Sequence, residues 1–233
     1  MARKIIDEIL DIKSRFDISE DKSARFFNKY GPLLRSFSYV KNNINQKNIE
    51  IKNELLKYFP IALVAIVEGY YRETIKEMID NNKFYRDKLS RFNHLKFSIE
   101  PILAIDANSV SIGELVSHLV AINNISNIND TMKLFTDRDF IKDIKALINI
   151  NYEINTKSKQ DNAKIIFKHL NNMFEMRHIF CHELSNSVSV DEIELEQMFT
   201  SVTWLYLATE VYVTHIPNGE TKAYDIYYKN REA

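Results

Sequence analysis

Turn-forming residues are scarce in this chain: only four glycines and four prolines stand among its 233 residues. Tight β-turns rely on both residue types, so turn-rich sandwiches and barrels usually contain more of them. Long stretches are instead rich in Asn, Lys, Glu, Ile and Leu, and they show few alternations of apolar and polar residues. We therefore predict an all-α protein.

Length, charge and cysteine content limit the remaining possibilities. The chain is long enough to bury one substantial core, and we expect a single domain over residues 1–233. A formal net charge of −1 excludes a polybasic coat but permits a local basic patch. The lone Cys181 cannot form an internal disulfide, and no secretory signal is recognisable. The longest apolar run, 61–67, is far shorter than the roughly 20 residues that span a bilayer, so we expect a cytoplasmic protein without a membrane segment.

Local signals place several helix boundaries. Pro60 suits the first position of a helix, where its missing N–H costs nothing, and that helix should end at Asn81-Asn82. The Gly31-Pro32 pair predicts a kink or a break in a helix over about 20–42. A further helix should begin near Asp161. Two pairs with capping-box spacing mark other helix starts, namely Ser111 with Glu114 and Ser189 with Glu192.

The segment 177–183 reads Arg-His-Ile-Phe-Cys-His-Glu, which concentrates reactive side chains in two helical turns. An arginine can clamp a phosphate with its planar guanidinium, and a histidine can move a proton near neutral pH. Few structural helices need both side chains at once. This segment is therefore the main candidate for a functional site.

Arg177 and Glu68 each interrupt an apolar stripe. Arg177 fills the gap of seven residues between Met173 and Phe180, and Glu68 interrupts the stripe of the Pro60 helix in the same way. A charge in a buried seam is costly unless it is paired or faces a ligand. We therefore predict that the two helices meet and that Glu68 pairs with Arg177. The pair would either fix the helix register or aim the guanidinium at a phosphate.

The two histidines of this segment allow more than one interpretation. His182 lies about 140° round an ideal helix from Arg177, whereas His178 and His182 share a face. A histidine beside an apolar stripe is commonly a core or interface residue. Both could instead hold a metal ion, with a third ligand from Cys181, Glu175 or Glu183. Because the His-Glu-x-x-His order is missing and Arg177 would repel a cation, we expect neither a metal nor a cofactor.

A basic run occupies residues 83–96, where Asp87 is the only acidic residue. Aromatic residues are interleaved with it, namely Phe84, Tyr85 and Phe92. One interpretation is a solvated helix face; the other is an RNA-facing patch in which the aromatic rings offer stacking platforms. The second interpretation predicts RNA contacts from Lys83, Arg86, Lys88 and Arg91.

The spacing from Arg177 through polar His178 to His182, near the end of a helix in an all-α chain, resembles the HEPN superfamily (higher eukaryotes and prokaryotes nucleotide-binding domains). The segment 62–72, Ala-Leu-Val-Ala-Ile-Val-Glu-Gly-Tyr-Tyr-Arg, looks like the early helix of several bacterial HEPN groups, whose acidic residue sits opposite the Arg–His motif. The resemblance covers core helices at about 60–80, 161–184 and 189–214 and leaves helical additions at about 1–55 and 98–158. It departs from the family at position 178, where Asn or Asp is common.

The resemblance implies an up-and-down helical bundle that dimerises and joins two Arg–His motifs in one composite cleft. Many members are metal-independent endoribonucleases of toxin–antitoxin or antiphage systems, so RNA, a second copy and an antitoxin or defence-system protein are the expected partners. It implies His182 as general acid/base, Arg177 as phosphate stabiliser, Glu68 as the orienter of Arg177 and His178 as a supporting group. Attack by the RNA 2′-OH would leave a 2′,3′-cyclic phosphate and a 5′-OH. Further RNA contacts are expected from Tyr71 and Arg72.

Two other functions fit the same residues. Some HEPN proteins bind RNA, a nucleotide or a protein without cutting, so the chain could be a non-catalytic dimerisation module. Alternatively, Glu68, Arg177 and the two histidines could form a buried polar network in a purely structural helical protein.

Overall fold

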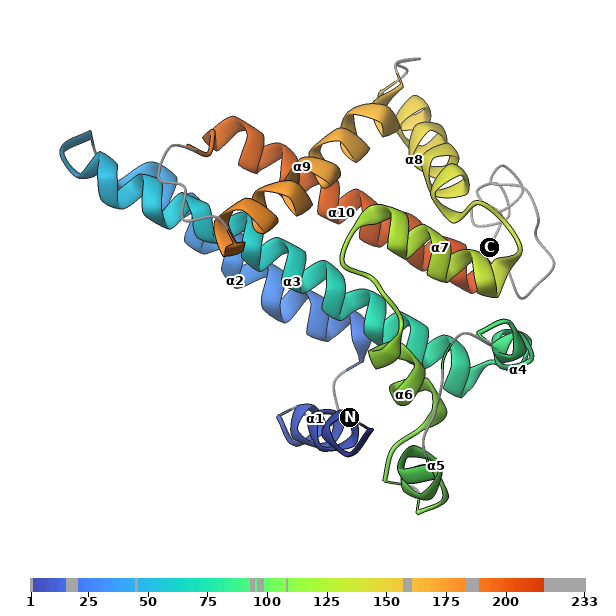
Figure 1. Ribbon diagram of the computed structural model, residues 1–233. Coiled ribbons are helices and arrows are strands. Elements are labelled where there is room, and N and C mark those ends of the chain that lie inside the picture. The colour runs from blue at the N-terminus through green and yellow to red at the C-terminus, as the bar shows by residue number, and fades with distance from the viewer. Residues whose placement is uncertain are drawn as a thin grey trace. The chain divides into compact units, whose positions relative to one another are not determined.

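A computed structural model describes residues 2–15, 21–44, 46–92, 95, 99–107, 109–156, 161–182 and 189–215 (Figure 1). Within these ranges the chain forms α-helices and two short 3₁₀ helices and no strand, which confirms the all-α prediction. The α-helices are α1 (Ala2–Ser14), α2 (Lys22–Asn43), α3 (Ile49–Asn81), α4 (Lys83–Arg86), α5 (Ile99–Asp106), α6 (Ile112–Leu119), α7 (Ile125–Thr136), α8 (Phe140–Thr156), α9 (Asn162–His182) and α10 (Glu192–His215). The 3₁₀ helices are η1 (Gln46–Asn48) and η2 (Leu89–Arg91).

The chain divides into two compact units. Unit 1 comprises Met1–Phe26 and Glu68–Asp137, and unit 2 comprises Phe27–Val67 and Arg138–Ala233. Helices α2 and α3 both run from one unit into the other, so the chain crosses the division inside continuous helices. None of the helices in the described ranges combines the length and the apolar character needed to cross a membrane.

Two prolines lie inside helices, which corrects the predicted boundaries. Helix α3 begins at Ile49 rather than Pro60, and α2 is not split at Pro32. An interior proline removes one backbone hydrogen bond and crowds the carbonyl four residues earlier, at a cost of about 3 kcal/mol. The turns around Pro60 bury Leu56, Phe59 and Leu63 almost completely. Burial of such side chains contributes about 1.5–3 kcal/mol each, which outweighs the local cost.

The predicted helix starts had mixed outcomes. The capping box of Ser111 and Glu114 is present at the start of α6. Helix α9 begins next to Asp161, whose Oδ1 accepts from the backbone N–H of Lys164 at 3.1 Å, as expected from the sequence. The predicted start at Ser189 is wrong, because α10 begins at Glu192. There the carboxylate of Asp191 accepts from a first-turn amide at 3.2 Å and takes over the capping role.

Unit 2 is built on mutual packing of α8, α9 and α10. Leu170 and Met173 of α9 have no exposed surface, and α9 is also tied to α8 because Asn149 Oδ1 accepts from the N–H of Ala163 at 2.8 Å. The first half of α3 and most of α2 add aromatic rings, and Phe37 stacks on Phe199 with 5.2 Å between ring centroids. This core fixes α9, the helix that carries the Arg–His segment.

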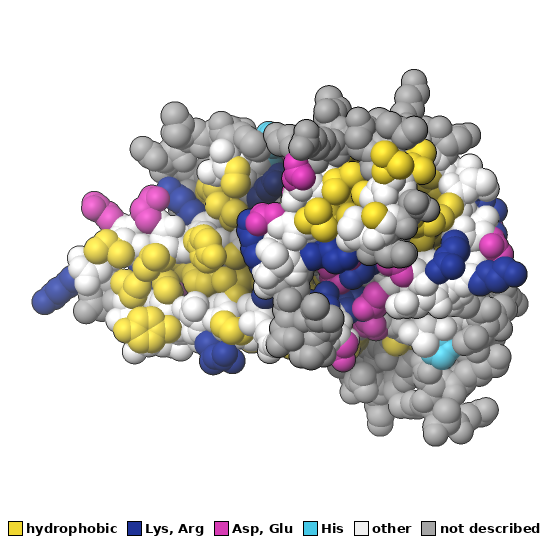
Figure 2. Space-filling view, turned by 90° about the horizontal axis from the view of Figure 1, so that it is seen from below, with side chains coloured by type: hydrophobic (Ala, Val, Ile, Leu, Met, Phe, Trp, Pro, Cys, Tyr) yellow, Lys and Arg dark blue, Asp and Glu magenta, His cyan; other side chains and the backbone are white. Residues whose placement is uncertain are grey.

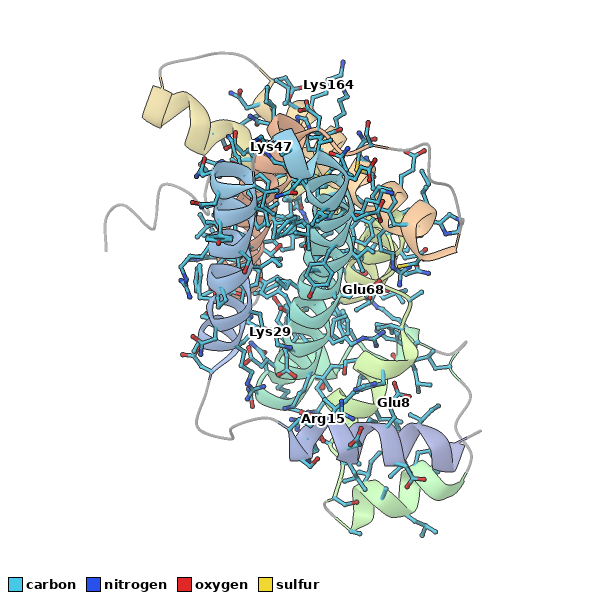
Figure 3. The ribbon with its side chains drawn as sticks, turned by 90° about the vertical axis from the view of Figure 1, so that its left-hand side faces the viewer. Glu8, Arg15, Lys29, Lys47, Glu68 and Lys164 are labelled. Carbon is cyan, nitrogen blue, oxygen red and sulfur yellow. The ribbon has the colours of Figure 1, made fainter. Side chains whose placement is uncertain are left out.

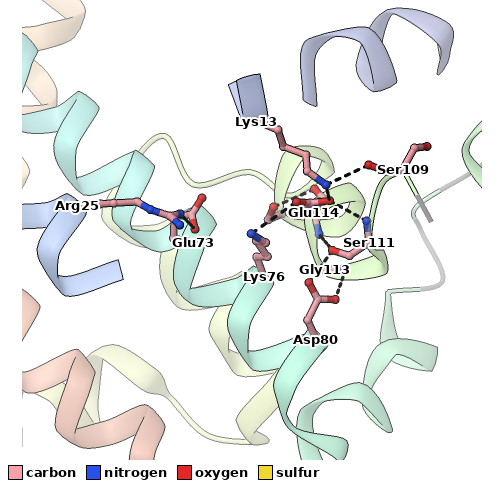
Figure 4. Close-up of polar contacts among 10 residues, drawn as sticks. Lys13, Arg25, Glu73, Lys76, Asp80, Ser109, Ser111, Gly113 and Glu114 are labelled. Atoms are coloured by element: carbon pink, nitrogen blue, oxygen red, sulfur yellow. Dashed lines mark hydrogen bonds and ion pairs between the residues drawn. The ribbon is translucent and has the colours of Figure 1, made fainter. Parts of the chain in front are cut away.

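Unit 1 combines α1, α5 and α6 around a small apolar cluster of Ile9, Val110 and Leu115. A polar junction joins this cluster to the second half of α3 (Figure 4). Asp80 of α3 accepts from Ser111 Oγ at 2.5 Å and from the N–H of Gly113 at 2.9 Å. A Cβ at Gly113 would stand 2.5 Å from the carbonyl oxygen of Lys76, so only glycine allows this close approach of α6 to α3.

Glu114 completes the junction. Its carboxylate accepts from Lys13 Nζ of α1 at 3.1 Å and lies 3.5 Å from Lys76 Nζ of α3. Burial raises the pKa of Glu114, but the hydrogen bonds from Ser111 and Lys13 more than offset this and leave the pKa below its usual value. The ionised carboxylate therefore holds α1, α3 and α6 together across unit 1.

Candidate functional site

Arg177 lies in the C-terminal turns of α9 and is half-buried. It continues the line of Leu170 and Met173, which are fully buried two turns and one turn earlier, respectively. The sequence predicted that Arg177 fills a gap in this apolar stripe, and its half-buried position agrees with that prediction. A partly exposed arginine in this position can reach a ligand while its stem packs on the core.

His178 follows Arg177 and is exposed, and so is Cys181 one turn later. His182 is the last residue of α9, and its side chain lies outside the described residues, as does Glu183. The helical backbone nevertheless sets the relation between positions 177 and 182 at about 140° around the axis. Among the side chains that the structure describes, no three His, Cys, Asp or Glu residues form a group that could hold a metal ion.

Glu68 lies in the middle of α3 and is half-buried (Figure 3). Its neighbours Val64 and Tyr71, one turn away on either side, are buried. Glu68 therefore interrupts an apolar stripe of α3, as the sequence predicted. Glu68 belongs to unit 1, whereas Arg177 belongs to unit 2. The Glu68–Arg177 ion pair stays a prediction.

Arg72, one turn after Glu68, takes part in a polar cluster of unit 1. Its Nη1 donates to the carbonyl oxygen of Ser117 in α6 at 2.6 Å. Burial lowers the pKa of Arg72, and the nearby carboxylates of Glu68 and Glu8 partly oppose this. A phosphate that approached Arg72 would therefore compete with a carbonyl and two carboxylates for the guanidinium.

His118 of α6 joins the same cluster, although no motif in the sequence pointed to this residue. Burial lowers its pKa, and the charge of Arg72 lowers it further, against the opposing effect of Glu8, Glu114 and Glu73. The imidazole is therefore neutral at pH 7. A lone histidine in the apolar segment Leu-Val-Ser-His-Leu-Val forms no recognisable motif, because three of its four charged neighbours, Glu8, Arg72 and Glu73, come from α1 and α3.

The RNA contact predicted for Tyr71 is contradicted by its burial. The side chain of Tyr71 has no exposed surface, and its ring contacts Tyr70 edge-on with 5.3 Å between centroids. A ring without an exposed face cannot stack on a base. The residue is part of the core of unit 1.

The basic run of residues 83–96 is largely engaged with the protein itself. Lys88 Nζ lies 2.9 Å from Asp137 Oδ2, and Arg91 binds the same carboxylate and also the carbonyl oxygen of Leu134 at 3.1 Å. These two cations hold the pKa of Asp137 below its usual value. Arg91 and Asp137 also line a shallow open hollow, together with Asp130, Lys133 and Leu134.

Arg86 of the same run is also engaged with the protein. Arg86 donates to the carbonyl oxygens of Ile79, at 3.0 Å, and of Asp80, and so caps the C-terminal end of α3. The expected stacking platforms Tyr85 and Phe92 are buried, which leaves Phe84 as an exposed ring in this segment. Lys83 is exposed. The structure thus favours a structural role for most of this run, because its charges satisfy carbonyls and a carboxylate.

An exposed apolar stripe runs along the first half of α3. Ile51, Leu55 and Tyr58 are spaced four and three residues apart, so they share one face of the helix, and each is more than two-fifths exposed. Figure 2 shows apolar side chains gathered over the outer ends of α2 and α3. Contiguous exposed apolar surface of this kind is typical of association sites.

No known protein family, characterised protein or solved structure matches this chain.

Proposed function

We propose that this protein is a metal-independent endoribonuclease of the HEPN type. The observation that carries the proposal is the end of α9, where half-buried Arg177 is followed by exposed His178 and, four residues later, by His182. A permanent cation and two histidines within two turns of one helix supply the kinds of group that metal-free RNA cleavage needs. Packing of α9 against α8 and α10 supports it, since a site on a rigid helix holds its geometry.

The proposed reaction assigns one role to each residue. His182 takes the proton of the RNA 2′-OH or gives one to the departing 5′ oxygen, since an imidazole titrates near neutral pH. Arg177 stabilises the phosphorane with its fork of N–H donors. Glu68 orients Arg177, and His178 supports the site from its exposed position. The 2′ oxygen forms the new bond to phosphorus while the 5′ oxygen leaves, so the products are a 2′,3′-cyclic phosphate and a 5′-OH.

The proposed assembly is a homodimer that joins two such helix ends in one cleft. The exposed apolar stripe of α3 supports association, because its side chains would lose contact with water in a complex. Toxin–antitoxin and antiphage systems are the proposed setting, with an antitoxin or a defence-system protein as a second partner. Sedimentation of the purified protein tests the dimer directly.

The function is tested by incubating purified protein with single-stranded RNA in EDTA and comparing wild type with His182→Ala. His169→Ala is the matched control, because it removes another histidine of the same helix. We expect cleavage by wild type and by the control, none by His182→Ala, and none of a 2′-deoxy substrate. A folded wild type that binds RNA and leaves it intact would instead favour the non-catalytic binding module.

A further inference from the structure

The solvent-exposed row of α9 extends well beyond the Arg–His segment. Lys164, Lys168, Asn171, Glu175 and His178 are all exposed, and their spacing of four, three, four and three residues keeps them within about 40° of one line. Position 182 returns to this same line, because eighteen residues make five full turns of an ideal helix. The row from Lys164 to His178 is about 21 Å long at 1.5 Å per residue.

The beginning of the row is its basic end. Lys164 points outward from the first turn of α9 (Figure 3), and Lys168 follows one turn later. Lys145 of α8 adds a third cation nearby, since both it and Lys164 lower the pKa of Asp161. Asp161 is the local countercharge, but its Oδ1 already accepts from Asn149 Nδ2 at 2.9 Å and from the N–H of Lys164. The carboxylate is thus engaged as the helix cap.

Glu175 is the acidic residue of the row and lies between the basic end and His178. Its charge disfavours a phosphate at that point. A bound strand would therefore place phosphates at the two ends of the row and present a sugar or base at Glu175. Glu175 and Arg177 are two residues apart and therefore about 160° apart around the helix axis, so the negative charge lies on a different face from the guanidinium.

We propose that single-stranded RNA lies along this row, with Lys164 and Lys168 binding phosphates away from the cut while the scissile phosphate lies at the His178 end, where the long side chain of Arg177 reaches it from the adjoining face, about 100° round the helix from His178. This inference rests on the proposed ribonuclease function and adds the residues that position the strand. Lysines that bind phosphates contribute affinity through release of condensed counterions, which makes binding depend on salt. A row along one rigid helix also sets a minimum substrate length, because a dinucleotide held at Arg177 cannot reach Lys168.

The binding test uses the double variant Lys164→Glu/Lys168→Glu in a His182→Ala background. Fluorescence anisotropy with a labelled 12-nucleotide RNA gives the affinity from low to high salt. We expect about tenfold weaker binding near physiological salt and a slope of log Kd against log salt that is smaller by about 1 per lysine. Glutamate at position 164 is compatible with folding, because an acidic residue suits the first turn of a helix.

The matched control is Lys29→Glu/Lys47→Glu, which changes the net charge by the same amount. Both residues are exposed and lie on other elements of unit 2, α2 and η1. We expect the control to keep wild-type affinity and slope. An equal loss of affinity in both double variants would overturn the proposal that RNA binds along this row, because it would show a general effect of protein charge.

A cleavage comparison separates this inference from the proposed function. In a background with His182 intact, the lysine variant should cleave a dinucleotide as fast as wild type but show a KM about tenfold higher for the 12-nucleotide RNA. Equal KM values of wild type and lysine variant for the 12-nucleotide RNA would refute the proposal that RNA lies along this row, but would not affect the proposed ribonuclease activity. No cleavage by wild type, together with lysine-dependent binding, would refute the ribonuclease and support the row as an RNA-binding surface.

Discussion

Replacing Gly113 with alanine should destabilise unit 1 strongly. A Cβ at this position would lie 2.5 Å from the carbonyl oxygen of Lys76 and 2.7 Å from the carboxylate carbon of Asp80. The first contact involves backbone of α3, which cannot move aside as a flexible side chain can. Separating α6 from α3 would also stretch the hydrogen bonds of Asp80 to Ser111 and Gly113. Overpacking of this kind costs about 3 kcal/mol.

Gly69→Ala is the matched control, because a Cβ at Gly69 meets nothing within 4 Å. Gly69 lies on the exposed side of α3, where alanine is the better helix former by up to about 1 kcal/mol. For a chain of this size, thermal denaturation followed by circular dichroism should show Gly113→Ala melting about 6–12 °C lower and Gly69→Ala about 2–4 °C higher. Equal melting temperatures for Gly113→Ala and wild type would refute the close approach of α6 to α3.

Three further predictions concern His118, Arg177 and Glu175. Burial and Arg72 lower the folded-state pKa of His118, so the neutral imidazole contributes stability that is present above pH about 6.5 and is lost as the pH falls. In urea-unfolding measurements, His118→Gln should therefore flatten the decline of the unfolding free energy below that pH. An unchanged decline would contradict this role of His118. Arg177→Lys keeps the charge but loses the planar fork, so kcat should fall about 100-fold with little change in melting temperature, whereas a large drop in melting temperature would indicate a structural role. Glu175→Gln removes the acidic residue of the α9 row and should tighten RNA binding about threefold by anisotropy, and weaker binding would argue against phosphates near this row.

Most features set by neighbouring residues could be predicted from the sequence, the helix start at Ser189 being an exception, and features set by distant contacts could not. The capping box of Ser111 and the end of α3 at Asn81 depend on a few consecutive residues, and both are present. The position of Pro60 could not be inferred in this way. Its intrinsic preference for a helix start is overridden by apolar side chains that α3 buries on both sides of it.

The candidate site shows the same division. The stripe of α9 predicted that Arg177 faces the core, because helical periodicity alone decides which positions do so, and the structure shows Arg177 half-buried. The basic run around Arg91 was harder to interpret, since Asp137, its counterion, is 46 residues further along the chain. The cluster of Arg72 and His118 likewise exists only after α3 and α6 pack together. Charge patterns in a sequence show which residues are ionised but not which of them are neutralised in the fold.

The central claim is that the helix end carrying Arg177 and His182 cuts RNA by using the substrate's own 2′-OH. The most direct measurement is mass spectrometry of the fragments of a defined RNA oligonucleotide, cleaved for short times in EDTA. We predict upstream fragments that end in a 2′,3′-cyclic phosphate and downstream fragments that begin with a 5′-OH. Downstream fragments with a 5′-phosphate would contradict the account, because attack by water in place of the 2′-OH would have broken the bond on the other side of the phosphorus.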